Sequence, residues 1–179
     1  MKPYLRKLFT ACASIVLLGC GLTAPKNNDG YAHLGSPGRF DTNHTMTLSL
    51  GPTLLGFAAS HIDGDPETRA LLQGLEGVRI KIYEIHGDAS RVATRMEMMS
   101  LKLREQDWDP IVLIQEEGEW VNMLIKVTGT RISGLTVLSS DSEEAIMVNI
   151  MGNLRPELFT TAMAALDIDT PEIRVAVGE

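Results

Sequence analysis

Four short segments of alternating apolar and polar residues follow one another between residues 111 and 151, and they constrain the fold more than any other feature. Short turn sequences rich in Gly, Ser, Asp and Glu separate the segments, which are Ile111–Gln115, Trp120–Thr128, Arg131–Ser139 and Glu143–Met151. Alternating segments joined by short turns are typical of consecutive antiparallel strands. The second half of the chain therefore predicts an antiparallel meander.

Alternate residues of a strand point to the same face of its sheet. For this meander we expect one shared apolar face, made by Val121, Met123, Ile125, Val127, Ile146, Val148 and Ile150. Gly134 interrupts the third strand, and a glycine inside a strand indicates a bulge or a bend. We therefore expect the third strand to be irregular at Gly134.

Shorter elements are expected before the meander. Met46–Leu50 alternates and predicts a short strand. The pair Asp65-Pro66 combines a good N-cap with a good first helical residue, so a helix is expected from there to about Leu72. Apolar residues at helical spacing predict another short helix over Thr53–His61.

A further strand is expected where Val78, Ile80 and Ile82 alternate with Arg79, Lys81 and Tyr83. This alternation predicts a half-buried strand whose basic side chains lie on the solvent face. Two longer helices should present apolar stripes to the core. Their inward residues are expected to be Val92, Met96, Met99 and Leu103 after an Asp88 cap, and Leu158, Phe159, Ala162 and Leu166 after Pro156.

The order is therefore strand, helix, four strands and helix, after an N-terminal strand and short helices. We predict an α+β domain with an antiparallel sheet of four to five strands and its helices on one face. This connectivity is that of TATA-binding-protein repeats and helix-grip proteins. The analogy concerns topology and carries no function.

The N-terminus has the features of an export signal. Lys2, Arg6 and Lys7 precede an apolar run over residues 8–18 that is too short to span a bilayer. The run ends in Leu17-Leu18-Gly19-Cys20, which resembles the bacterial lipobox, where cleavage between Gly19 and Cys20 follows alkylation of the Cys thiol. We expect a signal peptide at 1–19 and an acylated Cys20 that anchors the protein in the lipid bilayer. The alternative is an ordinary secretory signal with Cys20 near the cut.

The rest of the chain divides by composition. Residues 20–45 are rich in Gly, Pro, Asn and Asp and predict a lipidated flexible tether, followed by a single domain at 46–167 and a C-terminal tail at 168–179. Gly21 follows Cys20, and without an Asp there the periplasmic face of the outer membrane is the expected location. The formal net charge of −7 argues against nucleic acid as a partner.

Three stretches resemble the bacterial lipoproteins of the domain-of-unknown-function family 4252. They are LLQGLEGVRIKIYEI at residues 71–85, WDPIVLIQEEGEWVNMLIK at residues 108–126 and GLTVLSSDSEEAIMVNIMGNLRPE at residues 134–157. The likeness covers about residues 46–167. It implies a small, single-domain, membrane-anchored protein, and it brings no activity, cofactor or catalytic residue.

The chain offers little catalytic chemistry. Its four His residues share no metal-ligand spacing, and none of the common nucleophile, phosphate-loop or zinc-protease motifs is present. The acidic stretch from His61 to Glu67 lacks the ligand ladder of a Ca²⁺ loop, so a capped loop is the better interpretation. We expect no enzyme, no metal site and no cofactor.

Acidic residues gather in two turns of the predicted meander. Alternate turns of a meander lie at the same end of its sheet, so six acids should lie near one another: Glu116, Glu117, Glu119, Asp141, Glu143 and Glu144. Lys126 and Arg131 should flank the turn at the other end. This acidic end is either a set of solvated turns or a surface that meets a basic partner.

Two functions fit these patterns. The first is a non-catalytic, membrane-anchored envelope lipoprotein that binds an envelope protein in regulation or assembly. The second is a carrier or sensor of a small apolar ligand held between the sheet and the Met-rich helix. A pocket beneath that helix would favour the carrier, whereas a filled core would favour the binding module.

Overall fold

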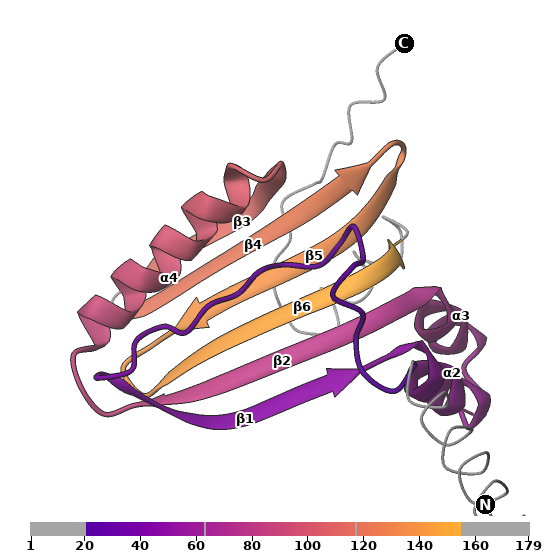
Figure 1. Cartoon of the computed structure of the whole chain (residues 1–179), viewed down its shortest axis with the longest axis horizontal. Coiled ribbons are helices and arrows are strands. Elements are labelled where there is room, and N and C mark those ends of the chain that lie inside the picture. The colour runs from indigo at the N-terminus through magenta and orange to yellow at the C-terminus, as the bar shows by residue number, and fades with distance from the viewer. Residues whose placement is uncertain (1–20, 63, 117, 155–179) are drawn as a thin grey trace, which may run out of the picture.

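The computed structural model describes residues 21–154 except Asp63 and Glu117. Within them, six strands form one antiparallel sheet in the order β1-β2-β6-β5-β4-β3 (Figure 1). The strands are β1 Thr42–Leu50, β2 Leu75–Ile85, β3 Trp108–Glu116, β4 Glu119–Thr128, β5 Arg131–Ser140 and β6 Glu144–Leu154. The chain thus has the predicted α+β class, but its sheet has six strands and not four to five.

Within the described part of the chain, three helices accompany the sheet, namely α2 Pro52–Ser60, α3 Pro66–Gly74 and α4 Ala89–Arg104. Asp65 caps α3 by accepting hydrogen bonds from the backbone amides of Glu67 and Thr68, as its position before Pro66 predicted. Asp88 caps α4 in the same way. No helix among the described residues is long and apolar enough to cross a membrane.

The helix predicted from Pro156 and the tail at 168–179 lie outside the described residues. The same is true of the signal peptide, the cleavage site and Cys20.

The register of the meander agrees with its sequence pattern. Val121, Ser139 and Ile146 are cross-strand neighbours, and so are Ile125, Leu135 and Ile150. The seven apolar residues predicted to share a face therefore do so. The pairing of β5 with β6 shifts between Ile132 and Gly134, which confirms the predicted irregularity at this glycine.

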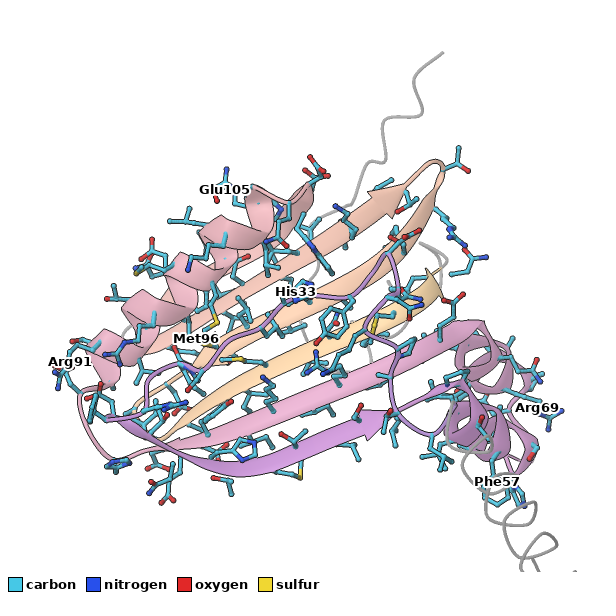
Figure 2. The ribbon with its side chains drawn as sticks, in the orientation of Figure 1. His33, Phe57, Arg69, Arg91, Met96 and Glu105 are labelled. Atoms are coloured by element: carbon cyan, nitrogen blue, oxygen red, sulfur yellow. The ribbon has the colours of Figure 1, made fainter. Side chains whose placement is uncertain are left out.

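One face of the sheet carries the main core. Helix α4 packs against β3, β4 and β5 on this face, and α2 and α3 lie at the end of the sheet (Figure 1). Met96 points from α4 toward the sheet (Figure 2), where it is fully buried with Val92 and Leu103. Trp108, Trp120, Leu124, Leu138 and Met147 fill the same cluster from the strands.

The N-terminal segment at residues 21–41, here called the strap, crosses the same face of the sheet beside α4 (Figure 1). Ala32 is fully buried in the main core, and Leu34 is nearly so. The Asn149 side chain of β6 binds the backbone of the strap through two hydrogen bonds. Its Oδ1 accepts from the Ala32 amide at 3.0 Å, and its Nδ2 donates to the Gly30 carbonyl at 2.9 Å. For residues 21–41, the prediction of a flexible tether is therefore wrong.

The strap also overturns the predicted orientation of β2. Arg79 and Lys81 were expected on the solvent face, but both lie on the face that the strap covers. Lys81 Nζ donates to the Leu34 carbonyl at 2.9 Å, and the Arg79 guanidinium stacks on the Tyr31 ring with its carbon 4.7 Å from the centroid. Burial lowers the pKa of Lys81, with a smaller contribution from the positive charge of Arg79.

Candidate binding surfaces

The opposite face of the sheet is apolar. Helix α4 and the strap both lie on the other side. Leu154 is buried here in a second cluster with Met123 and Leu135, but most apolar residues of β1, β2 and β6 on this face are half-buried or exposed. They are Met46, Leu48, Leu50, Val78, Ile80, Ile82, Ile146, Val148 and Ile150. Because such a surface is costly in water, it is a candidate contact surface.

The acidic turns form a second surface at the end of the sheet where α4 begins. Glu116 and Glu119 face each other across the β3–β4 turn. Trp120 pairs with Ser140, and Ser140 pairs with Ala145, so the β5–β6 turn lies beside the β3–β4 turn. Asp141, Glu143 and Glu144 are exposed there, whereas Glu117 lies outside the described residues.

A pocket of about 360 Å³ opens at this acidic end, between the turns and the first turns of α4. Its rim includes the exposed carboxylates of Glu97, Glu116, Glu119 and Asp141. The buried residues Trp120 and Ser140 also line it. Three of the six acids singled out in the sequence therefore line one pocket, joined by Glu97, which the sequence did not single out.

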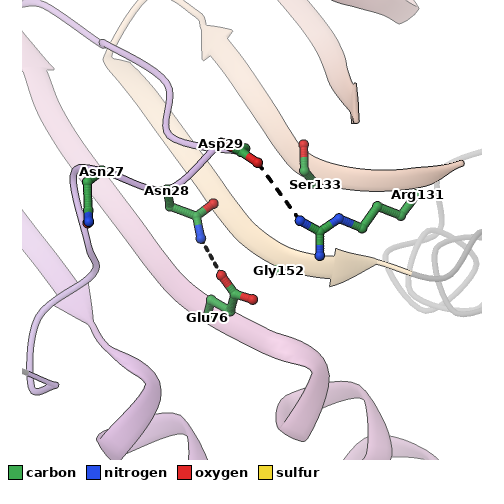
Figure 3. Close-up of a pocket in the computed structure, with 7 residues that line it drawn as sticks. All are labelled: Asn27, Asn28, Asp29, Glu76, Arg131, Ser133 and Gly152. Atoms are coloured by element: carbon green, nitrogen blue, oxygen red, sulfur yellow. Dashed lines mark hydrogen bonds and ion pairs between the residues drawn. The ribbon is translucent and has the colours of Figure 1, made fainter. Parts of the chain in front are cut away.

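Lys126 and Arg131 lie at the other end of the sheet, as expected from the meander. Each is near an acidic residue: Lys126 Nζ is 3.6 Å from Asp107 Oδ2, and an Arg131 nitrogen is 3.9 Å from Asp29 Oδ2. A polar pocket of about 170 Å³ lies at this end, where Asn28 donates to Glu76 and Arg131 faces Asp29 (Figure 3). Each carboxylate of this pocket therefore has a polar partner, and Arg131 supplies a cation beside Asp29.

Asp41 joins the strap to α4 and was not found from the sequence. Its side chain is 2% exposed, and its two oxygens lie 2.9 Å from an Arg91 nitrogen and 2.7 Å from an Arg95 nitrogen. The hydrogen bond from Arg95, followed by that from the Asp88 amide, lowers the pKa of Asp41 below its ordinary value of 3.8. A lone Asp in a Gly- and Pro-rich stretch gave no signal of this role.

Replacement of Asp41 by Asn should lower the melting temperature at neutral pH by about 5–10 °C, because the partly exposed guanidinium groups of Arg91 and Arg95 lose a buried carboxylate that accepts from both. The pKa of Asp41 is lower in the folded than in the unfolded chain, so its stabilisation is complete above 3.8 and is lost as the pH falls below that value. The difference in melting temperature should therefore shrink in acid. Circular dichroism melts at several pH values measure both effects.

The exposed Asp109 provides the control for this variant. Asp109→Asn removes the same charge and should leave the melting temperature within about 1–2 °C of the unchanged protein. Equal effects of Asp41→Asn and Asp109→Asn would show that Asp41 does not tie the strap to α4.

Comparison with protein families matched most of the described chain to a family model. The family model described as Domain of unknown function (DUF4252) matches residues 39–160. No curated protein and no solved structure matches the chain.

Proposed function

We propose a function for this chain, which belongs to the DUF4252 family: it is a non-catalytic envelope lipoprotein whose folded part binds another protein at its acidic end. The proposal has three parts, namely an acylated Cys20, an orientation relative to the bilayer and a basic partner. The convergence of acidic residues around one pocket is the observation that carries it.

The place where the strap begins supports the orientation. The Gly21 carbonyl accepts from the Thr53 amide at 3.1 Å, and the Leu22 carbonyl accepts from the Gly51 amide at 2.8 Å. The residues that follow Cys20 are thus held at the start of α2. A bilayer that holds the acyl chains of Cys20 would lie near the α2 end, so the acidic end would point away from it (Figure 1).

Exposed apolar side chains at the α2 end fit the same orientation. Leu22 is 44% exposed, Leu54 is 38% exposed and Phe57 is 64% exposed. Phe57 lies at this end of the molecule, far from Arg91 at the start of α4 (Figure 2). Apolar side chains beside a lipid anchor add affinity for the membrane interface.

The acidic end supports a protein partner over a small apolar ligand. Its carboxylates are exposed and give this end of the molecule an acidic surface, which favours encounter with a basic surface. The carrier alternative needs space between α4 and the sheet. Val92, Met96, Leu124 and Met147 are each fully buried in one hydrophobic cluster there, which supports close packing beneath this part of α4.

Neutralising the pocket acids should abolish the partner contact. With a photo-reactive residue at Thr94 on the rim, the unchanged protein should cross-link to a defined protein in intact cell envelopes. The triple variant Glu116→Gln, Glu119→Gln and Asp141→Asn should reduce that product at least tenfold, since several charge pairs are lost together. Gel analysis and mass spectrometry of the product provide the measurement.

The control triple variant changes exposed acids away from the pocket: Glu67→Gln, Glu105→Gln and Asp109→Asn. It alters the net charge equally and should retain the product. An unchanged cross-link in the pocket variant would refute the acidic contact.

The membrane anchor is tested separately. Cys20→Ser should lose both palmitate incorporation and membrane fractionation, and retention of both would refute the anchor.

A further inference from the structure

The charge around the acidic pocket is uncompensated. Four of its lining residues are acidic, Glu97, Glu116, Glu119 and Asp141, and none is Lys, Arg or His. Among the described residues, no ion pair involves any of these four carboxylates. By contrast, the polar pocket at the other end carries its own Arg131. Within the described residues, the acidic pocket therefore has no cationic side chain of its own.

A buried hydroxyl provides independent evidence that the pocket takes a ligand. Ser140 lines the pocket and is 2% exposed, and its Oγ has no hydrogen-bond partner among the described residues. Buried hydroxyl groups in folded proteins almost always have a partner, because an unsatisfied one is costly. A donor that enters from the pocket would satisfy Ser140.

The lining distinguishes between kinds of cation. No group of three or more His, Cys, Asp or Glu side chains within the described residues is arranged to hold a metal ion. Trp120, Ala89 and Ala93 contribute apolar surface beside the acidic rim. An apolar stem with a charged, hydrogen-donating head matches both surfaces, as in Arg and Lys side chains.

We propose that this pocket binds the guanidinium or ammonium group of a basic side chain of the partner, with the rim carboxylates as counter-ions and Ser140 Oγ as an acceptor. This inference rests on the proposed function, since the side chain belongs to the protein that binds the acidic end. The volume of the acidic pocket, about 360 Å³, lies in the range of small-ligand sites.

The probe is the peptide acetyl-Gly-Arg-Gly-amide, titrated into the full mature protein in detergent micelles. The indole N–H resonance of Trp120 should shift with the Arg peptide, and that of Trp108, which is buried away from the pocket, should not. The peptide with citrulline in place of Arg should bind at least tenfold more weakly, because it lacks the charge. Equal binding of both peptides would overturn the proposal.

Two variants test the named contacts. Ser140→Ala should weaken the Arg peptide about three- to tenfold, and Glu116→Gln with Glu119→Gln should weaken it tenfold or more. Glu105→Gln, at the far end of α4 (Figure 2), should have little effect. Circular dichroism confirms that each variant is folded. A loss with Glu105→Gln as large as with the pocket variants would overturn the proposal, because it would reflect only net charge.

Two further ligands test whether the pocket prefers a basic side chain, a free small cation or a metal ion. Ethylguanidinium should bind at least tenfold more weakly than the peptide, and equal binding would assign the pocket to free small cations. Ca²⁺ should not displace the peptide, and displacement at micromolar Ca²⁺ would assign the pocket to a metal.

The envelope cross-link from Thr94 separates this inference from the proposed function. If the cross-link persists in Ser140→Ala and in the Glu116/Glu119 variant, this inference fails while partner binding stands. Arg-peptide binding with no envelope cross-link would refute the proposed function.

Discussion

Replacement of Asn149 by Ala is expected to lower the free energy of unfolding by about 3 kcal/mol. The Asn149 side chain is fully buried and bonds to Gly30 and Ala32 of the strap. It also lies 3.3 Å from both the Leu135 carbonyl and Thr136 Oγ1. Its removal leaves a buried amide and a buried carbonyl of the strap without partners, each at a cost of about 1–3 kcal/mol. Urea denaturation followed by circular dichroism measures the loss.

The exposed Asn153 on the same strand supplies a matched control. Asn153→Ala makes the same chemical change outside the core and should alter stability by no more than about 0.5 kcal/mol. If the two variants unfolded at the same urea concentration, the strap would not depend on the Asn149 amide.

The order of helices and strands in residues 46–151 was predictable because local patterns determine it. Alternation and short turns predicted the meander, and Asp-Pro at 65–66 predicted the start of α3. The acidic end was predictable for a related reason. Once the meander is known, the geometry of antiparallel strands alone places its alternate turns at the same end.

The orientation of β2 was not predictable in this way. Alternation shows that Arg79 and Lys81 share a face, but not whether that face meets water. The answer depends on the strap, whose backbone carbonyls accept from Lys81 and whose Tyr31 ring receives Arg79. The strap has no periodic pattern, because its residues dock through backbone hydrogen bonds and small side chains. Its Gly, Asn and Pro content therefore resembles that of a flexible linker.

Two buried polar residues were not found from the sequence, namely Ser140 at the acidic pocket and Asn149 beneath the strap. Ser140 is one of two consecutive Ser residues at a strand end, and only the packing of Trp120 and α4 makes it buried. Asn149 is a polar residue within an apolar strand, which could have suggested a buried hydrogen bond. The helix predicted from Pro156, with its stripe of Leu158, Phe159, Ala162 and Leu166, stays a prediction.

Replacement of Gly30 by Ala is expected to detach the strap and to lower the free energy of unfolding by about 3 kcal/mol or more. A Cβ at residue 30 would lie 1.9 Å from the Ser133 carbonyl oxygen and 2.8 Å from Gly134 Cα. Both obstacles are backbone atoms of β5, so no rotation of a side chain can relieve the overlap. Detachment would expose Ala32 and Leu34, and it would separate Asn149 from both of its strap partners. Urea denaturation and limited proteolysis of residues 21–41 measure the two consequences.

Gly35→Ala makes the same substitution in the same strap and provides the control. A Cβ there would meet only the Met99 sulfur, at 3.9 Å, which is an ordinary contact. Gly35→Ala should therefore match the original protein in stability within about 0.5 kcal/mol and resist proteolysis equally. The reciprocal variant Gly134→Ala should behave like Gly30→Ala, because its Cβ would lie 2.7 Å from Gly30 Cα. If Gly30→Ala were as stable and as protease-resistant as Gly35→Ala, the strap would not cross closely over β5. The orientation proposed for the membrane anchor would then lose its support.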